Sequence, residues 1–255
     1  MAEVVLWHIT FSNFNEKARW ALDWKRVPHV RRAPPNGGHA PLALVLSRGA
    51  HRTFPVLTID GHSIGDSTAI IAELERRYPE PPLYPSDAEE QRHALELEEF
   101  FDENYGHEVR RLAFWHLLSD DEAAARTVHE MMGSVAVPLA PLIRSALWSY
   151  YGISEESASR ARELILAGFD RIEAERAGGD YLVGERFSVA DLAAAALAGP
   201  LLMPPEFPWR ARGEPPPGLV RVRSELSEHP AAQWINRTHA KHRLPAPRAA
   251  VTAPA

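Results

Sequence analysis

The sequence predicts an α/β domain followed by an all-helical domain. Up to residue 80, short apolar runs typical of β-strands alternate with segments of helical periodicity. Residues 78–90 (YPEPPLYPSDAEE) are rich in proline, as in an extended linker, and beyond them nearly every segment has helical periodicity. We therefore expect an α/β domain at 1–80, a linker at 81–92, a helical domain at 93–242 and a frayed tail at 243–255.

The first domain is expected to have the element order βαβαββα. Apolar and β-branched runs predict its strands, at residues 3–9, 27–32, 53–59 and 62–64. Apolar residues at helical spacing predict its helices, at residues 15–26, 41–49 and 67–78. The dipeptide Asp60–Gly61 is typical of a tight hairpin turn and joins the last two strands. This order implies a mixed sheet with helices on its faces.

Five helical segments are expected in the second domain, at residues 94–118, 121–152, 154–179, 188–202 and 229–242. Gly106 weakens the first of them locally, and Pro138 and Pro141 kink or break the second. Ser188 and Asp191 fit a capping box, which is a folding role rather than a catalytic one. The tail is too small in its side chains and too rich in proline to pack.

Composition excludes several classes of protein. The chain has no cysteine, so disulfides, thiolate metal sites and cysteine nucleophiles are excluded, and none of its 12 histidines forms H-E-x-x-H, so no metal site is expected. A formal net charge of -6 without a basic stripe argues against a nucleic-acid partner. No apolar run reaches the roughly 18 residues that span a membrane, and the start MAEVVLWHI lacks the basic residues of a signal peptide. We expect a cytoplasmic protein with no membrane partner.

Pro55 lies inside an apolar run that otherwise resembles an ordinary strand. Proline removes a ladder hydrogen bond, so it belongs at a sheet edge, at a bulge or in a cis bond. A strand that begins at Pro55 leaves the backbone groups of Phe54 free to pair with an extended peptide ligand. The Phe54–Pro55 bond is expected to be cis, beside such a ligand edge.

Asp66 and Ser67 open the helix that follows the hairpin. Helix capping alone accounts for a short oxygen-bearing side chain at this place. The same position also suits a ligand, because a helix N-terminus offers free N–H groups and partial positive charge to a carboxylate. The Ser67 hydroxyl then adds to that site, while Asp66 faces an ammonium group.

Three motifs together resemble those of the glutathione transferases. F-P-V-L at 54–57 is followed by a hairpin and by D-S-T-A-I at 66–70. SNFNEKARWALDWKRVPH at 12–29 is similar to the first catalytic loop and helix of the family. FSVADL at 187–192 resembles a capping segment of the helical domain in that family. The motifs occur in both halves of the chain and in the family's order.

The resemblance implies a thioredoxin-like first domain that binds glutathione. It implies a cis-proline at Pro55, backbone pairing of Phe54 with the tripeptide, and a grip of Asp66 and Ser67 on the γ-glutamyl end.

Three basic side chains are candidates for the glycine carboxylate of glutathione: Arg52, His39 and His51. Solvated surface charge is the commoner explanation for each. The chain also departs from the family here, because SRGAHRTFP at 47–55 replaces the usual P-x-G-x-V-P run.

The resemblance places Ser12 where the family keeps its activating serine, tyrosine or cysteine. The thiolate is the nucleophile, and a free thiol with a pKa near 8.5 is only a few per cent thiolate at pH 7. A hydroxyl donor and a nearby helix N-terminus both stabilise the anion. Helix capping is the alternative role for Ser12. Because Asn13 replaces a common proline, Thr10, Asn13 and Asn15 are alternative donors.

Substrate selection is expected from the helical domain and from Phe11. Aromatic and charged residues of the long helix form two stripes, one with Tyr105, Val109, Leu112 and His116, the other with Glu108, Arg111 and Trp115. At least one stripe packs in the core, and the one that faces the first domain lines a cleft between the domains. The sequence does not specify which stripe this is, so the candidates for the cleft, Tyr105, Arg111 and Trp115, come from both. A proline-rich insert at 204–218 is expected to form a surface loop near that cleft.

The missing cysteine excludes mixed-disulfide chemistry, so thiol transfer and dehydroascorbate reduction are excluded. Transfer of an alkyl or aryl group to glutathione, with glutathione as co-substrate and no metal, is the expected activity. A non-catalytic binding protein on the same fold, a specialised isomerase or lyase, and another low-molecular-weight thiol remain alternatives. The resemblance also implies a homodimer.

Overall fold

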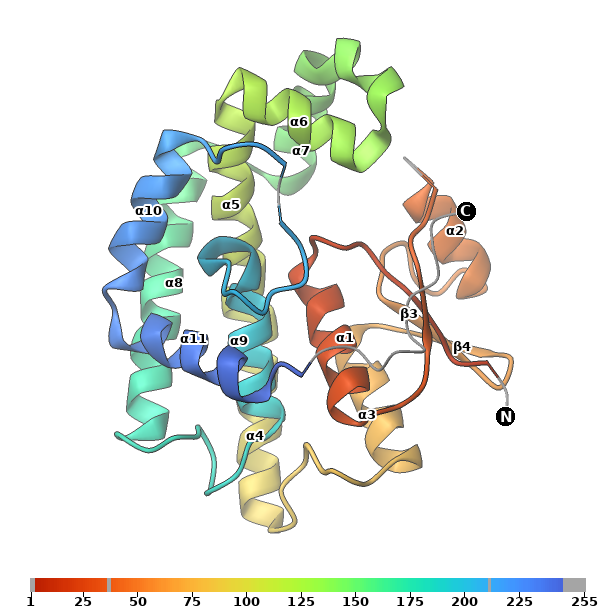
Figure 1. Ribbon diagram of the computed structural model, residues 1–255, viewed down its shortest axis with the longest axis vertical. Coiled ribbons are helices and arrows are strands. Elements are labelled where there is room, and N and C mark those ends of the chain that lie inside the picture. Colours follow the sequence, from red (N-terminus) through yellow and green to blue (C-terminus); the bar gives the residue numbers. More distant parts are fainter. Residues whose placement is uncertain (1–2, 36–37, 211, 245–255) are drawn as a thin grey trace.

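A computed structural model describes residues 3–35, 38–210 and 212–244 of the chain (Figure 1). The first domain has a four-stranded sheet, formed by β1 (Val5–Trp7), β2 (Val30–Arg32), β3 (Val56–Ile59) and β4 (His62–Gly65). The strand order is β2-β1-β3-β4, in which β1 pairs parallel with β2 and antiparallel with β3. The hairpin of β3 and β4 turns at Asp60 and Gly61, both at positive φ. The sheet is mixed, as predicted.

Three helices complete the first domain: α1 (Asn13–Trp24), α2 (His39–Leu46) and α3 (Ser67–Arg77). The predicted βαβαββα order is therefore confirmed. Helix α1 is buried along most of its length because it packs against α3 and also against a helix of the second domain. The core of this domain joins that of the second domain through Trp20, Ala21 and Leu22, which are fully buried.

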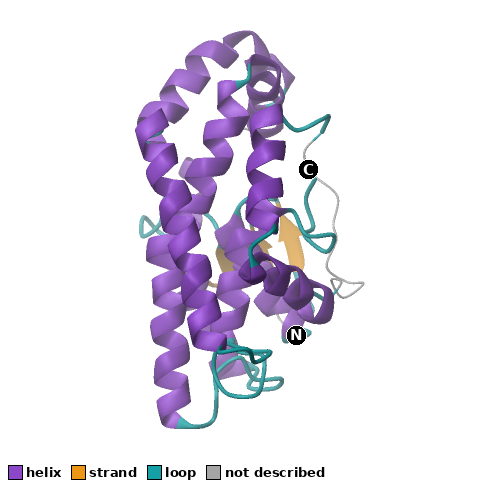
Figure 2. Cartoon of the chain, turned by 90° about the vertical axis from the view of Figure 1, so that its left-hand side faces the viewer, coloured by secondary structure: helices purple, strands orange, loops and turns teal. Residues whose placement is uncertain are grey.

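The second domain is entirely helical, as predicted, and its long helices run alongside one another (Figure 2). Its elements are α4 (Ala88–Phe101), the π-helical turn η1 (Asp102–Gly106), α5 (His107–Ser119), α6 (Asp121–Met132), the 3₁₀ segment η2 (Ser134–Leu139), α7 (Ala140–Tyr151), α8 (Glu155–Arg176), α9 (Val189–Leu202), α10 (Pro217–Ser227) and α11 (Pro230–His242). Within the described ranges, no helix has the length and apolar character that crossing a membrane requires.

Several predicted details of this domain are confirmed. A 3₁₀ segment containing Pro138 separates α6 from α7, and the predicted capping box of Ser188 and Asp191 begins α9. Helix α10 was not predicted, because its sequence follows a run of prolines. Pro217 stands at its first turn, where the missing N–H and the fixed φ of proline are tolerated.

The predicted frayed tail is wrong at its first residue. Arg243 is only 8% exposed because its guanidinium forms ion pairs with Glu16 and with Asp23, the latter at 2.7 Å from Nη1 to Oδ2. Both carboxylates belong to α1 and are buried, and Arg19 also pairs with Glu16, at 2.7 Å. Burial would raise the pKa of Glu16, but Arg243 and Arg19 lower it to about 2. The chain after α11 is thereby fastened to the first domain. The rest of the predicted tail, 245–255, lies outside the described residues.

Two buried histidines make the fold sensitive to mild acid. Burial, with the charge of Arg19 beside it, lowers the pKa of His8 from 6.5 to about 2, and burial lowers that of His239 from 6.5 to about 4. Below pH 6.5 these two histidines bind protons in the unfolded chain but not in the folded chain. The free energy of unfolding therefore decreases as the pH is lowered. Asp191 opposes this between pH 6 and 3.8, because burial raises its pKa from 3.8 to about 6.

We expect the free energy of unfolding to be about 2–3 kcal/mol lower at pH 5 than at pH 7.5, since each unmatched proton contributes ~1.4 kcal/mol per pH unit. Urea denaturation at the two pH values measures this difference. His239→Gln keeps a donor for the Ala195 carbonyl, 3.0 Å from Nε2, and should remove about 2 kcal/mol of the loss, since one of the unmatched protons no longer contributes between pH 6.5 and pH 5. A denaturation midpoint that is equal or higher at pH 5 would contradict the expectation.

Candidate functional site

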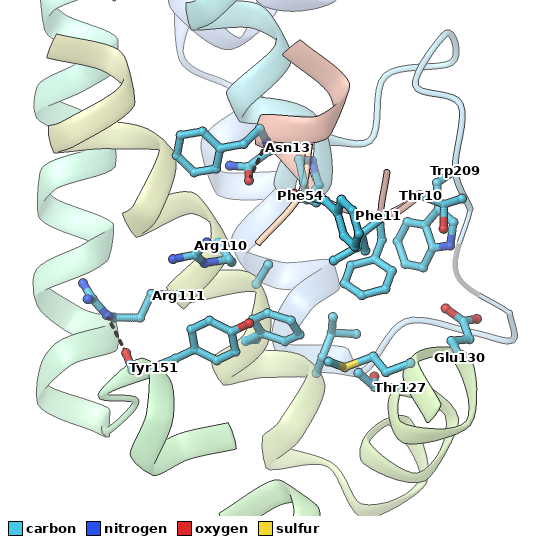
Figure 3. A pocket seen from close by; sticks show the side chains of 18 of the residues that line it. Thr10, Phe11, Asn13, Phe54, Arg110, Arg111, Thr127, Glu130, Tyr151 and Trp209 are labelled. Atoms are coloured by element: carbon cyan, nitrogen blue, oxygen red, sulfur yellow. Dashed lines mark hydrogen bonds between the residues drawn. The ribbon is translucent and has the colours of Figure 1, made fainter. Parts of the chain in front are cut away.

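A cavity of about 1060 Å³ lies between the two domains. The first domain contributes the β1–α1 loop, the Phe54–Pro55 segment and the start of α3. The second domain contributes α5, α6, the end of α7 and the loop from Met203 to Pro216 (Figure 3). Of the predicted site residues, this cavity brings together Phe11, Ser12, Phe54, Pro55, Asp66, Ser67 and Arg111. Arg52, Tyr105 and Trp115 do not line it.

The Ser12 side chain is held by the amide of Asn15. Ser12 is the N-cap of α1, with Oγ 3.5 Å from the Asn15 backbone N, so the capping role exists. The Asn15 Nδ2 donates to the same Oγ at 2.8 Å and to the Phe54 carbonyl at 2.9 Å, while its Oδ1 accepts from the Ile9 N–H at 3.0 Å. Because Oγ already accepts, the hydroxyl proton of Ser12 is left to donate, and no acceptor for it occurs among the described residues.

The three alternative donors to the thiolate, Thr10, Asn13 and Asn15, differ in whether their hydrogens are already donated within the protein. Asn13 is buried, and its Nδ2 donates to the carbonyls of Gly106 at 2.8 Å and Leu197 at 3.2 Å. Both hydrogens of the Asn15 amide are also used, as described above. Thr10 lines the cavity and is exposed, so its hydroxyl is accessible from the cavity. The sequence suggests Asn15 only as an alternative donor to the thiolate. Its contacts indicate instead that it positions Ser12.

The predicted cis bond between Phe54 and Pro55 is confirmed. The prediction that both backbone groups of Phe54 are free is only half right, because its carbonyl accepts from Asn15. Its N–H has no hydrogen-bond acceptor in the part of the chain that the structure describes. One main-chain donor therefore remains beside Ser12 for an extended ligand.

Asp66 and Ser67 have different roles at the start of α3. Asp66, at φ 71°, is the N-cap, and its Oδ1 accepts from the N–H groups of Thr68 at 2.9 Å and Ala69 at 3.1 Å. Ser67 is 2% exposed and lines the cavity. Neither its N–H nor its hydroxyl has a partner among the residues described, so both can donate to an anion at the helix N-terminus.

The candidates for a second carboxylate subsite separate in the structure. His39, at the start of α2, and His51 line the cavity. Arg52 is exposed and lies outside the cavity lining. The histidines are therefore the better placed of the three.

The cavity wall of the second domain is a helix face that was not predicted. Its members recur at spacings of four and three residues and are Glu103, His107, Arg110, Phe114 and Leu117. Tyr105 instead faces the core, fully buried between Phe101 and Phe169, and Trp115 stacks on Trp148 at 6.1 Å between ring centroids. The periodicity of the sequence contained this face, but nothing in it says which face meets the other domain.

The proline-rich loop before α10 forms the opposite side of the cavity. This agrees with the prediction that residues 204–218 form a surface loop near the cleft, except that α10 already begins at Pro217. Trp209 lies 5.8 Å from Phe11 between ring centroids, and Thr10 lies beside the two rings (Figure 3). Within the described ranges, no group of three or more histidine, aspartate or glutamate side chains has the arrangement of a metal site.

Known proteins resemble both domains. The family model of the glutathione S-transferase N-terminal domain matches residues 6–82, and that of the C-terminal domain matches residues 155–223. Maleylacetoacetate isomerase of Dictyostelium discoideum is 27% identical over 196 residues, covering 74% of this chain and 75% of the relative. A probable glutathione S-transferase of Solanum tuberosum is 23% identical over 198 residues, covering 78% and 73%. The crystal structure of a glutathione S-transferase from Methylobacterium radiotolerans, in complex with glutathione sulfonate, is 25% identical, with a TM-score of 0.53 over 91% of this chain and 94% of that one.

Proposed function

This chain belongs to the glutathione S-transferase superfamily, and on that premise we propose that it activates the thiol of glutathione for attack on a hydrophobic electrophile. The relatives support a glutathione-dependent activity in general. The observation that carries the finer proposal is the Ser12 hydroxyl, whose oxygen accepts from Asn15 and whose proton is left to donate at the cavity.

Ser12 acts by stabilising the thiolate. Lowering a thiol pKa by about two units requires roughly 2.7 kcal/mol of preferential stabilisation of the anion. The Ser12 O–H donates to the sulfur, and the N-terminus of α1 adds its partial positive charge. The thiolate then forms a C–S bond with the electrophilic carbon while the leaving group departs with its electron pair.

The remaining first-domain groups bind the rest of the tripeptide. The N–H and hydroxyl of Ser67 hold the γ-glutamyl carboxylate, and the free Oδ2 of Asp66 faces the ammonium group. The Phe54 N–H pairs with the peptide backbone, and His39 and His51, which line the cavity, are the candidates for binding the glycine carboxylate. Phe11, Phe114 and Trp209 supply apolar surface for the electrophile. The two-fold homodimer implied by the family resemblance and the cytoplasmic location expected from composition stay predictions.

Glutathione-assisted isomerisation is the second candidate. It is supported by the relatives named as maleylacetoacetate isomerase and probable maleylacetoacetate isomerase 1. The same thiolate would add to a conjugated double bond and leave again after rotation, so the demands on Ser12 and Ser67 are unchanged. A non-catalytic binding protein would need the groups that bind glutathione but not the donor at Ser12.

Calorimetric titration of the wild-type protein with glutathione tests the proposal, together with the ultraviolet absorbance of the bound thiolate against pH. We expect binding at millimolar concentration or below, a thiol pKa about two units under 8.5, and turnover of an aryl halide. No binding at millimolar glutathione would overturn the proposal, whereas another thiol that binds would replace glutathione in it. Binding with an unshifted thiol pKa and no turnover would indicate a non-catalytic protein, and turnover of a cis-alkene acid alone would favour the isomerase.

A further inference from the structure

Arg110 is a cation in the cavity wall that forms no ion pair with the residues that the structure describes. It lies on α5, half-buried, and Figure 3 shows it between Asn13 and Tyr151. Among the described residues, no carboxylate comes within ion-pair distance of its guanidinium. Within the described part of the chain its one hydrogen-bonding partner is His107, whose Nδ1 accepts from Nη2 at 3.0 Å. Since a guanidinium has five N–H donors, most of its capacity is unused.

Aromatic rings flank this guanidinium on two sides. Its central carbon lies 5.0 Å from the ring centroid of Tyr151 and 6.0 Å from that of Phe14. Cation–π attraction offsets part of the cost of removing the charge from water, but it provides no hydrogen-bond acceptor. Burial, together with the adjacent Arg111, lowers the pKa of Arg110. An arginine nevertheless stays charged at neutral pH, so its environment favours an incoming anion.

Four other arginines that line the cavity already have partners for their guanidinium groups, among them Arg210, which donates to three backbone carbonyls. Arg111 pairs with Glu108, and Arg126 pairs with Glu122 and also donates to the Glu214 carbonyl. Arg223 donates to two backbone carbonyls, those of Leu201 at 2.7 Å and of Pro200 at 3.2 Å. Arg110 therefore differs from these four by its open donors, and from Arg212, the remaining arginine of the lining, by being half-buried rather than exposed.

We propose that Arg110 is an anion subsite for the electrophile, and that the substrates of this protein carry a carboxylate on a planar, conjugated or aromatic group. The carboxylate accepts from the open N–H groups of Arg110, and the planar group lies along the rings of Tyr151 and Phe14. The inference rests on the proposed function, because it assigns the substrate class of the same cavity. It places the anion on the second domain, apart from the subsite of Ser67 on α3.

Two glutathione conjugates that differ in one group test this assignment. S-(4-carboxy-2-nitrophenyl)glutathione and its 4-carboxamide are titrated by calorimetry into the wild-type protein, with glutathione itself as a third ligand. We expect the acid to bind roughly tenfold or more tightly than the amide, the effect of a charge-assisted hydrogen bond. Arg110→Gln should remove that preference, and Arg110→Lys should keep part of it.

Arg144→Gln is the matched control. Arg144 pairs with Asp121 and lies 5.5 Å from the Trp148 ring, so the variant makes the same change of charge beside an aromatic ring outside the cavity. It should keep the wild-type preference for the acid. Equal binding of acid and amide to a wild-type protein that binds glutathione would overturn the inference and leave the proposed function intact. Arg110→Gln weakening glutathione as much as the acid conjugate would also overturn it, because Arg110 would then hold a carboxylate of glutathione. Absence of any glutathione binding would remove the proposed function and the inference together.

Discussion

Replacing Ser12 with alanine is expected to cut turnover by a factor on the order of ten to a thousand while glutathione affinity stays nearly intact. The variant removes the one hydroxyl that Asn15 fixes at the cavity, and with it a donor to the thiolate. The apparent pKa of the bound thiol should therefore rise by about one unit or more. Ultraviolet absorbance of the bound thiolate against pH measures that shift, and calorimetry measures the affinity.

Ser67→Ala is the matched control, because it removes a hydroxyl of the same size from the other end of the site. It should weaken glutathione binding by about 1–3 kcal/mol, since a charge-assisted hydrogen bond to a carboxylate is lost, and leave the thiol pKa where it is. An unchanged thiolate titration in Ser12→Ala would reduce Ser12 to a helix cap. The activating role would then pass to Thr10, because the amide hydrogens of Asn13 and Asn15 are already donated within the protein.

Arg243→Met is expected to lower the free energy of unfolding by about 3–5 kcal/mol, the cost of removing one partner from a buried ion-pair network. The change leaves Glu16 and Asp23 buried, each with a single remaining arginine, Arg19 and Arg31. Urea denaturation at neutral pH measures the loss.

Arg162→Met provides the comparison for this experiment. Arg162 pairs with Glu225 at 3.0 Å, but both side chains are nearly half exposed, so the pair is worth about 0–1 kcal/mol. If the two variants lost the same stability, the buried network would contribute no more than a surface pair.

The first domain could be predicted from sequence because its signals are local. The Asp60–Gly61 turn, Pro55 before β3, and Asp66 with Ser67 at the start of α3 each specify backbone geometry within a few residues. The cavity wall of the second domain has no such local signal. Tyr105 and Arg110 lie on the same helical run, and only packing against Phe169 on one side and Phe14 on the other decides which of them meets the cavity.

The long-range contacts of Asn15 and Arg243 could not be predicted from the sequence either. Asn15 bonds to Phe54, 39 residues away, and Arg243 pairs with Glu16 across 227 residues. A buried polar side chain finds its partners only when the chain is folded, and its residue type does not name them. Arg243 lies at the start of a proline-rich stretch typical of disorder, so its two long-range ion pairs, with Glu16 and Asp23, make the prediction wrong there.

The two hydrogen bonds of Asn13 limit how this protein can be recombined with its relatives. The Asn13 amide belongs to the first domain, and its acceptors, the carbonyls of Gly106 and Leu197, belong to two separate helical elements of the second. Gly106 also leaves no spare room, since a Cβ there would lie 3.0–3.1 Å from Leu197 and Phe14. A chimera that joins this first domain to a foreign helical domain keeps the loop in place only if it presents two carbonyls at the same points and a residue as small as glycine between them. A chimera made to change the substrate range must therefore match the backbone positions that Asn13 contacts. Matching the side chains of the cavity would not be sufficient.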